Sequence, residues 1–187
     1  SERYGYTVPD FERYWFSRGG FSMQPNLLCH PIPYILRDEI KHFLRGYFNA
    51  FAVAFYPDTC MLTEHPLPTM ADWRGDHYKT SDESQSTYWL RLMLIFERCD
   101  ELYLAIATPQ DWLKDGKTIK VERAATYFGE MGFEINSHVA KGKICMTLQP
   151  PKRNPPKSIS VRFRHPQEEK IKKVTVNGKE WNDFDVE

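Results

Sequence analysis

The stretch from Glu64 to His77 holds most of the residues in this sequence that could do chemistry. Carboxylates can exchange protons, imidazole and guanidinium groups can hydrogen-bond polar ligands, and an indole ring can stack on a flat apolar surface. The surrounding segment, Tyr56–Lys79, reads as one long loop, and long ordered loops are often functional. The candidate residues are Glu64, His65, Asp72, Trp73, Arg74, Asp76 and His77.

The same residues also have ordinary structural interpretations. Asp72 and Asp76 suit turns, and Trp73 could fix the loop onto neighbouring helices. His65 and His77, with the two aspartates, include metal-ligand types, but their spacing matches no metal-binding motif. We therefore expect no metal site and no other cofactor.

Two helices are predicted to position this loop. Apolar residues recur at helical spacing over 38–55 and predict the first helix. The second is predicted over 81–98, with Thr80 as N-cap and Glu83 completing a capping box. From Tyr88 to Phe96 nearly every position is apolar, so this helix should be buried on most sides. We expect it to need more neighbours than this chain supplies, and the numbering to begin inside a longer protein.

The second half of the chain predicts strands instead. Short segments alternate apolar and polar residues with a period of two, which is typical of half-buried antiparallel strands. Asn177-Gly178 is a hairpin turn signal. Helices followed by strands predict an α+β chain, with residues 1–100 helical and residues 101–187 forming an antiparallel β-sandwich. The alternating segments are Lys117–Val121, Tyr127–Asn136, Lys143–Leu148, Ser158–Arg164 and Lys172–Val176.

The composition of the chain argues against a nucleic-acid partner and against a membrane span. Apolar residues make up 41% and charged residues 27%, as is typical of a soluble globular protein. Lysine and arginine balance aspartate and glutamate at 25 each, and no basic stripe predicts a nucleic-acid partner. The longest apolar run, Trp89–Phe96, is interrupted by Arg91 and is too short to span a membrane. The four cysteines lie far apart without a C-x-x-C pair.

The order of segments carries a resemblance. A buried helix containing Tyr88-Trp89-Leu90-Arg91-Leu92 runs into Leu102-Tyr103-Leu104-Ala105, then a Trp112-Leu113 turn, a Tyr127-Phe128-Gly129 step and a terminal hairpin. This order resembles the C-terminal region of six-hairpin glycosidases, over roughly residues 38–182. In that group an (α/α)6 toroid of helices is followed by a β-sandwich. The proline that often follows "L-A" in the group is displaced here to Pro109.

The resemblance implies a function for the loop. Residues 1–100 would be the last helices of the toroid, and the loop would face a poly- or oligosaccharide. Glycoside hydrolysis uses two carboxyl groups, for which Glu64 and Asp76 are the candidates. His65, Trp73, Arg74 and His77 would then bind the sugar. The resemblance also favours a periplasmic or extracellular location, and the rest of the parent chain, or a second copy, as cover for the exposed helices.

Two alternatives stay open. The chain could be a non-catalytic carbohydrate-binding module that uses aromatic residues of its β region, such as Tyr127, Phe128 and Trp181. It could also be a related toroid polysaccharide lyase, which would place Tyr78, His77 and Arg74 near a uronate.

Overall fold

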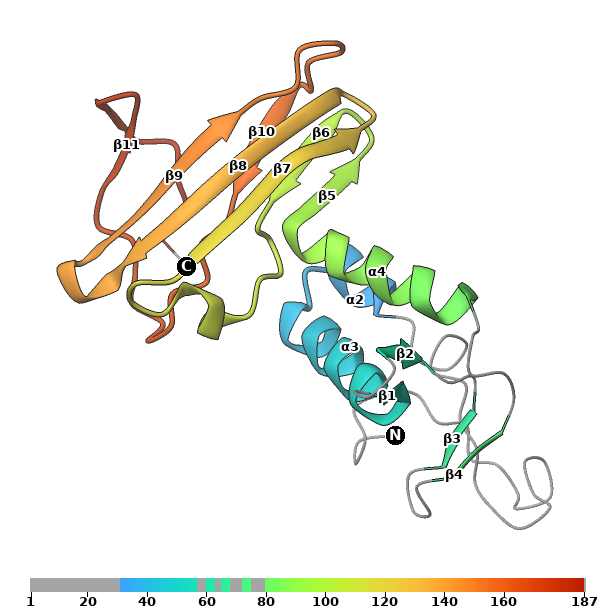
Figure 1. The fold of residues 1–187 in the computed structure, drawn as a ribbon. Coiled ribbons are helices and arrows are strands. Elements are labelled where there is room, and N and C mark those ends of the chain that lie inside the picture. Colours follow the sequence, from blue (N-terminus) through green and yellow to red (C-terminus); the bar gives the residue numbers. More distant parts are fainter. Residues whose placement is uncertain (1–30, 57–59, 63–64, 68–71, 75–79, 187) are drawn as a thin grey trace. The chain divides into compact units, whose positions relative to one another are not determined.

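A computed structural model describes residues 31–56, 60–62, 65–67, 72–74 and 80–186 of the chain. The chain divides into two compact units, Ser1–Leu94 and Ile95–Glu187, here called unit 1 and unit 2. The described α-helices all belong to unit 1, and the longest strands belong to unit 2, so the chain is of the α+β class (Figure 1).

Unit 1 is built on helices. Its long helix α3 agrees with the helix predicted over 38–55. One side of α3 is buried, with Phe43 at 0% exposure and Tyr47 at 6%. Phe48, one residue further along, is 43% exposed, so the described part of α3 also carries an exposed aromatic residue. The helices are α2 (Ile32–Leu36), α3 (Ile40–Ala54) and α4 (Thr80–Leu94).

Helix α4 is shorter and less buried than its sequence predicts. It ends at Leu94, and the next four residues form strand β5 (Ile95–Arg98). The β-branched and aromatic pair Ile95-Phe96 suits a strand, and pairing with β6 decides the conformation there. Tyr88 on α4 is 45% exposed, although Trp89, Leu92 and Met93 of the same segment are buried. The described chain therefore buries this segment only in part.

The predicted loop between α3 and α4 contains short paired strands. Strand β1 (Phe55–Tyr56) pairs antiparallel with β2 (Met61–Leu62). Strand β3 (His65–Leu67) pairs antiparallel with β4 (Asp72–Arg74). The expectation of one irregular loop is therefore wrong, and the candidate residues belong in part to regular structure.

Unit 2 contains two three-stranded sheets, which Figure 1 shows as separate layers. One sheet is an antiparallel meander of β7, β8 and β9, and the other has the order β10-β6-β5. A smaller hairpin pairs β11 with β12. The strands are β5 (Ile95–Arg98), β6 (Glu101–Leu104), β7 (Thr118–Thr126), β8 (Gly129–His138), β9 (Lys143–Gln149), β10 (Ser158–Val161), β11 (Val174–Val176) and β12 (Lys179–Trp181). Two short 3-10 helices, η1 (Gln110–Leu113) and η2 (Val139–Lys141), join them.

The core of unit 2 follows the period-two pattern. Leu102 and Leu104 of β6 are fully buried. On β8, Met131, Phe133 and Ile135 are buried at 3% exposure or less. Alternate residues on β6 and β8 therefore form apolar faces of the two sheets, as the sequence predicts.

One strand pairing differs from the prediction. Strand β10 runs parallel to β6, with Ser158 opposite Glu101 and Val161 opposite Leu104. A parallel pair needs a long crossover, and here the whole β7–β9 meander lies between β6 and β10 in sequence. The sheet order of unit 2 is therefore mixed, whereas alternation alone predicted antiparallel strands throughout.

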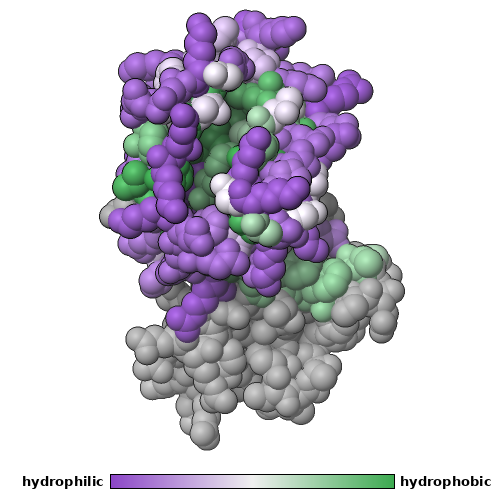
Figure 2. Space-filling model, turned by 90° about the vertical axis from the view of Figure 1, so that its left-hand side faces the viewer, coloured by the Kyte–Doolittle hydropathy of each residue, from purple (hydrophilic) through white to green (hydrophobic). Residues whose placement is uncertain are grey.

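The apolar face of the β7–β9 sheet is incompletely covered at its β9 edge. Met146 and Leu148 of β9 lie opposite the buried Ile135 and Phe133 of β8, but both are only half-buried. Figure 2, which views the side that carries β9 and β11 in Figure 1, shows apolar surface inside a frame of hydrophilic side chains. The core of unit 2 is thus tight along β8 and open towards β9.

The predicted Asn177-Gly178 hairpin is confirmed. Val176 pairs with Lys179 across the two turn residues, whose φ angles are 51° and 77°. Two successive positive φ angles define a type I′ turn, for which Asn-Gly is the favoured sequence.

Candidate functional site

The backbone of the β3–β4 ribbon brings together candidates that are about ten residues apart in sequence. His65 lies directly opposite Arg74, and Pro66 lies opposite Trp73. Asp72 lies opposite Leu67 and forms the third and last pair of the ribbon. Residues directly opposite each other in an antiparallel pair have Cα atoms about 4.5–5.5 Å apart. Four of the seven candidates therefore share one two-stranded ribbon.

The other candidates are near this ribbon only in sequence. Glu64 precedes β3 directly, and Asp76 and His77 follow β4 by a few positions. All three lie outside the described residues, as does Tyr78 of the alternative lyase set. For His65, Asp72, Trp73 and Arg74 the structure describes the backbone pairing.

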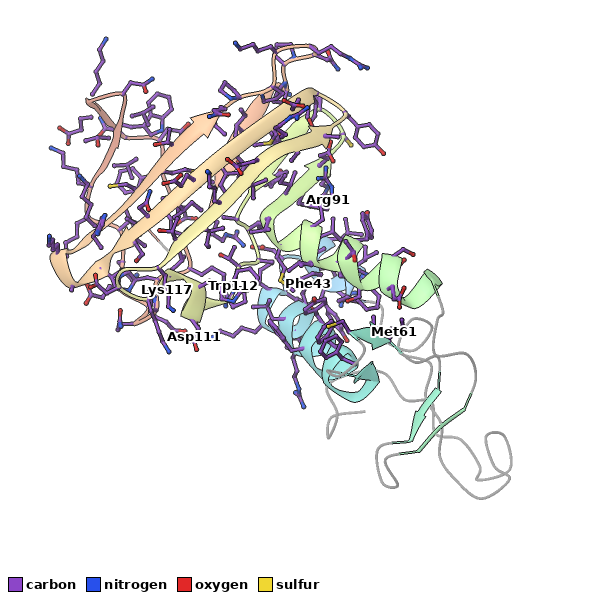
Figure 3. The ribbon with its side chains drawn as sticks, in the orientation of Figure 1. Phe43, Met61, Arg91, Asp111, Trp112 and Lys117 are labelled. Carbon is purple, nitrogen blue, oxygen red and sulfur yellow. The ribbon has the colours of Figure 1, made fainter. Side chains whose placement is uncertain are left out.

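The helices of unit 1 hold the ribbon in place. Strand β3 lies beside α3, and β2 lies beside α4. Figure 3 shows Phe43 near the start of α3, and Met61 on β2. Phe43 is fully buried and Leu62, next to Met61, is 7% exposed, so α3 and β2 both contribute to the apolar core of unit 1.

A buried hydrogen bond links the two long helices. The Tyr47 hydroxyl on α3 is hydrogen-bonded to the Ser86 side chain on α4, and both residues are buried. Burial raises the pKa of Tyr47, and the bond to Ser86 opposes part of that rise. The pair links α3 to α4 within unit 1.

Trp89 presents a buried donor in the same unit. Its side chain is 3% exposed, and the indole N–H has no acceptor among the residues that the structure describes. A buried unsatisfied donor costs about 1–3 kcal/mol. An acceptor for Trp89 from outside the described residues would therefore stabilise unit 1.

The aromatic residues proposed for a binding module behave differently from one another. Tyr127 is 79% exposed and Trp181 is 48% exposed. Phe128 is 4% exposed, so its expected role in contacting a ligand is wrong. The Trp181 indole N–H donates to the Asp183 carbonyl at 2.8 Å, which fixes that ring against its own chain.

Two residues that hold the turn at Tyr127 in place could not be identified from the sequence. The Tyr127 backbone N–H donates to the Glu97 carboxylate at 2.6 Å, and the Asn154 N–H donates to the Phe128 carbonyl at 2.9 Å. Glu97 and Asn154 come from separate segments, so no local pattern points to them. The proline pairs on either side of Asn154 were the available signal, since they predict a stiff connector.

The described part of the chain contains no cluster of three or more histidine, cysteine or acidic residues arranged to bind a metal. Its cysteines include the unpaired thiols of Cys99 and Cys145, whereas Cys29 lies outside it. None of its helices combines the length and the apolarity of a membrane span.

Comparisons with known proteins return no match, whether the chain is compared with family models, with curated proteins or with solved structures.

Proposed function

We propose that this chain is the C-terminal part of a carbohydrate-active enzyme, a glycoside hydrolase acting on a poly- or oligosaccharide. The β3–β4 ribbon then forms part of its sugar site. Unit 1 would be the end of an (α/α)6 toroid and unit 2 a β-sandwich domain. Glu64 and Asp76 are the proposed carboxyl groups of the reaction, and His65, Trp73, Arg74 and His77 are the proposed sugar ligands.

The observation that supports this proposal is the register of the ribbon. In this register His65 lies opposite Arg74, and Asp72 and Trp73 belong to the same strand as Arg74. Arginine and histidine donate hydrogen bonds to sugar hydroxyls and carboxylates, and indole rings stack on sugar faces. A segment with these four residue types on one small ribbon suits a polar ligand with flat apolar faces.

The order of elements supports the same proposal. Helix α4 continues directly into β5 and β6, followed by η1 with Trp112 and then the β7–β9 meander. This is the order on which the resemblance to six-hairpin glycosidases rests. The exposed Phe48 on α3 and Tyr88 on α4 are suited to contact further helices of the parent protein.

The test is release of reducing sugar from a panel of plant and host glycans. The 187-residue chain and the longest natural protein that contains it are assayed side by side. We expect the longer protein to release sugar and the 187-residue chain to be inactive. A longer protein that releases nothing from any glycan contradicts the proposal, and an unsaturated uronate product, detected by its ultraviolet absorbance, assigns the chain to the lyases instead.

A non-catalytic carbohydrate-binding module is the second candidate. The exposure of Tyr127 favours it, because a ring that lies largely in solvent is free to stack on a ligand. Its signature is glycan binding that persists when His65 and Arg74 are replaced by alanine and that disappears in Tyr127→Ala.

A further inference from the structure

One end of unit 2 is built from three segments that are far apart in sequence. The β5–β6 turn contributes Asp100, the β7–β8 turn contributes Tyr127 and Phe128, and the connector from β9 to β10 contributes residues 150–157. Figure 1 shows all three at the same end of the two sheets. We call this end of unit 2 the tip.

Hydrogen bonds join the three segments of the tip to one another. The Lys157 N–H donates to the Asp100 carbonyl at 2.8 Å, and the Asn154 N–H donates to the Phe128 carbonyl at 2.9 Å. The Tyr127 N–H donates to a carboxylate oxygen of Glu97 at 2.6 Å. The β7–β8 turn is thus held from both sides, by β5 and by the connector.

The turn itself is also internally fixed. The Thr126 hydroxyl donates to the Gly129 carbonyl at 2.6 Å and accepts from the Phe128 N–H at 3.1 Å. Phe128 is buried and anchors the turn, whereas Tyr127 beside it is 79% exposed. The Tyr127 ring therefore stands in solvent on a backbone that is restrained on every side.

The connector is stiff and carries positive charge. Prolines at 150, 151, 155 and 156 restrict its backbone on both sides of Lys152-Arg153-Asn154. Lys152, Arg153 and Lys157 are exposed and form no ion pair with any described residue.

Nearby carboxylates leave the tip an excess of positive charge. Glu97 is engaged by the Tyr127 N–H, and Glu130 lies 3.4 Å from the guanidinium of Arg123. The hydrogen bond from a neutral backbone N–H leaves Glu97 charged, so Glu97 and Asp100 together stand against the three cations of the connector.

We infer that the tip binds an acidic glycan, in which Tyr127 stacks on a sugar ring while Lys152 and Arg153 bind sugar carboxylates. A stacked ring contributes most when its backbone is already fixed, because little conformational entropy is then lost on binding. Arginine and lysine form charge-assisted hydrogen bonds with carboxylates, and arginine can do so with two parallel bonds. This inference rests on the proposed function in that the ligand is a carbohydrate, and it adds the class of carbohydrate and a second binding position.

The test is affinity gel electrophoresis of the 187-residue chain through gels that contain polygalacturonate or, as the neutral counterpart, amylose. The wild-type chain should be retarded by polygalacturonate alone, and added salt should weaken the retardation because it screens exposed charges. Tyr127→Ala should raise the dissociation constant about tenfold, from loss of ring stacking. The double variant Lys152→Ala/Arg153→Ala should abolish the retardation, and Tyr127→Phe should retain it.

Matched controls separate the tip from net charge and from folding. Lys170→Ala/Lys172→Ala removes the same charge from another exposed segment and should leave the retardation unchanged. Trp181→Ala removes another exposed aromatic residue and should also leave it unchanged. Thermal unfolding of each variant verifies that the fold is intact.

The outcomes distinguish this inference from the proposed function. Absence of retardation by polygalacturonate overturns the inference, and so does a loss in Lys170→Ala/Lys172→Ala as large as that in the tip variants. If the tip variants lose retardation while the longer natural protein hydrolyses no glycan, the inference stands and the proposed hydrolase fails. If the longer natural protein hydrolyses glycans but polygalacturonate does not retard the 187-residue chain, the proposed hydrolase stands and the inference about the tip fails.

Discussion

The guanidinium of Arg164 donates a hydrogen bond to the backbone carbonyl of Thr108 at 3.0 Å. This bond ties the chain after β10 to the loop after β6, and Thr108 itself is fully buried. Burial lowers the pKa of Arg164, with the nearby charge of Arg162 adding to the effect. The Gln110 side chain donates to the His165 carbonyl at 3.0 Å and forms a second link between the same two segments.

Removing the Arg164 side chain should therefore destabilise unit 2. Arg164→Met keeps much of the apolar stem but leaves the Thr108 carbonyl without its donor, which we expect to cost about 1–3 kcal/mol. Urea unfolding followed by tryptophan fluorescence measures this. Arg153→Met, at an exposed arginine without an ion pair among the described residues, is the control, and equal stability losses in the two variants contradict the structural role of Arg164.

Gly129 is required where the β7–β8 turn meets the connector. Its φ of 119° is in a region that side chains disfavour, and a Cβ atom there would lie 3.1 Å from the Arg153 Cβ and 3.3 Å from the Arg153 nitrogen. Gly129→Ala should therefore displace the connector and cost more than about 1 kcal/mol in the free energy of unfolding.

Gly116 provides the matched control for that change. It also has a positive φ, of 74°, but a Cβ atom there would meet nothing within 4 Å. Gly116→Ala should show a smaller stability loss than Gly129→Ala in the same urea titration. A Gly116→Ala variant that is as unstable as Gly129→Ala would show that the contact with Arg153 is immaterial.

Tyr47 should make stability fall at high pH. Because burial raises its pKa in the folded state, the folded chain holds the phenol proton more tightly than the unfolded chain does. The protonated phenol therefore contributes to the free energy of unfolding. This contribution is complete below about pH 10, the ordinary tyrosine pKa, and is lost as the pH rises through the folded-state pKa.

Tyr47→Phe tests this pH dependence. At neutral pH the variant should be less stable than wild type by about 1 kcal/mol, because it loses the hydrogen bond to Ser86. Above about pH 10 the difference should shrink, since phenylalanine does not ionise. Tyr127→Phe is the control, because Tyr127 stays in solvent in both states. A stability difference between wild type and Tyr47→Phe that is constant up to pH 12 contradicts the effect.

Local patterns were enough to predict much of the fold. The wide apolar stripe of α3, the period-two strands of unit 2 and the Asn177-Gly178 turn each depend on residues close in sequence. The end of α4 was predicted wrongly, because Ile95 and Phe96 continue an apolar run whose strand conformation depends on pairing with β6. The parallel pairing of β10 with β6 likewise depends on segments more than fifty residues apart.

The candidate site shows the same limit. Residue types alone identified His65 and Arg74, but their pairing depends on a ribbon of three-residue strands that carry no periodic signal. The hydrogen bond between Glu97 and Tyr127 could not be predicted either, because the carboxylate on β5 accepts it from a backbone N–H in a turn thirty positions away. Exposure could not be predicted either, since Tyr127 and Phe128 are adjacent aromatic residues with opposite environments.

The most direct test of the account is the steady-state kinetics of the longest natural protein that contains this chain, on the glycan it degrades best. His65→Ala and Arg74→Ala, at positions that pair across the β3–β4 ribbon, should each lower kcat/KM by tenfold or more, equivalent to about 1.4 kcal/mol of transition-state stabilisation. Arg74→Lys should recover part of the loss, and Lys179→Ala on the β11–β12 hairpin of unit 2 should behave as wild type. Unchanged kcat/KM in both ribbon variants, with thermal unfolding also unchanged, would contradict a sugar site at the β3–β4 ribbon.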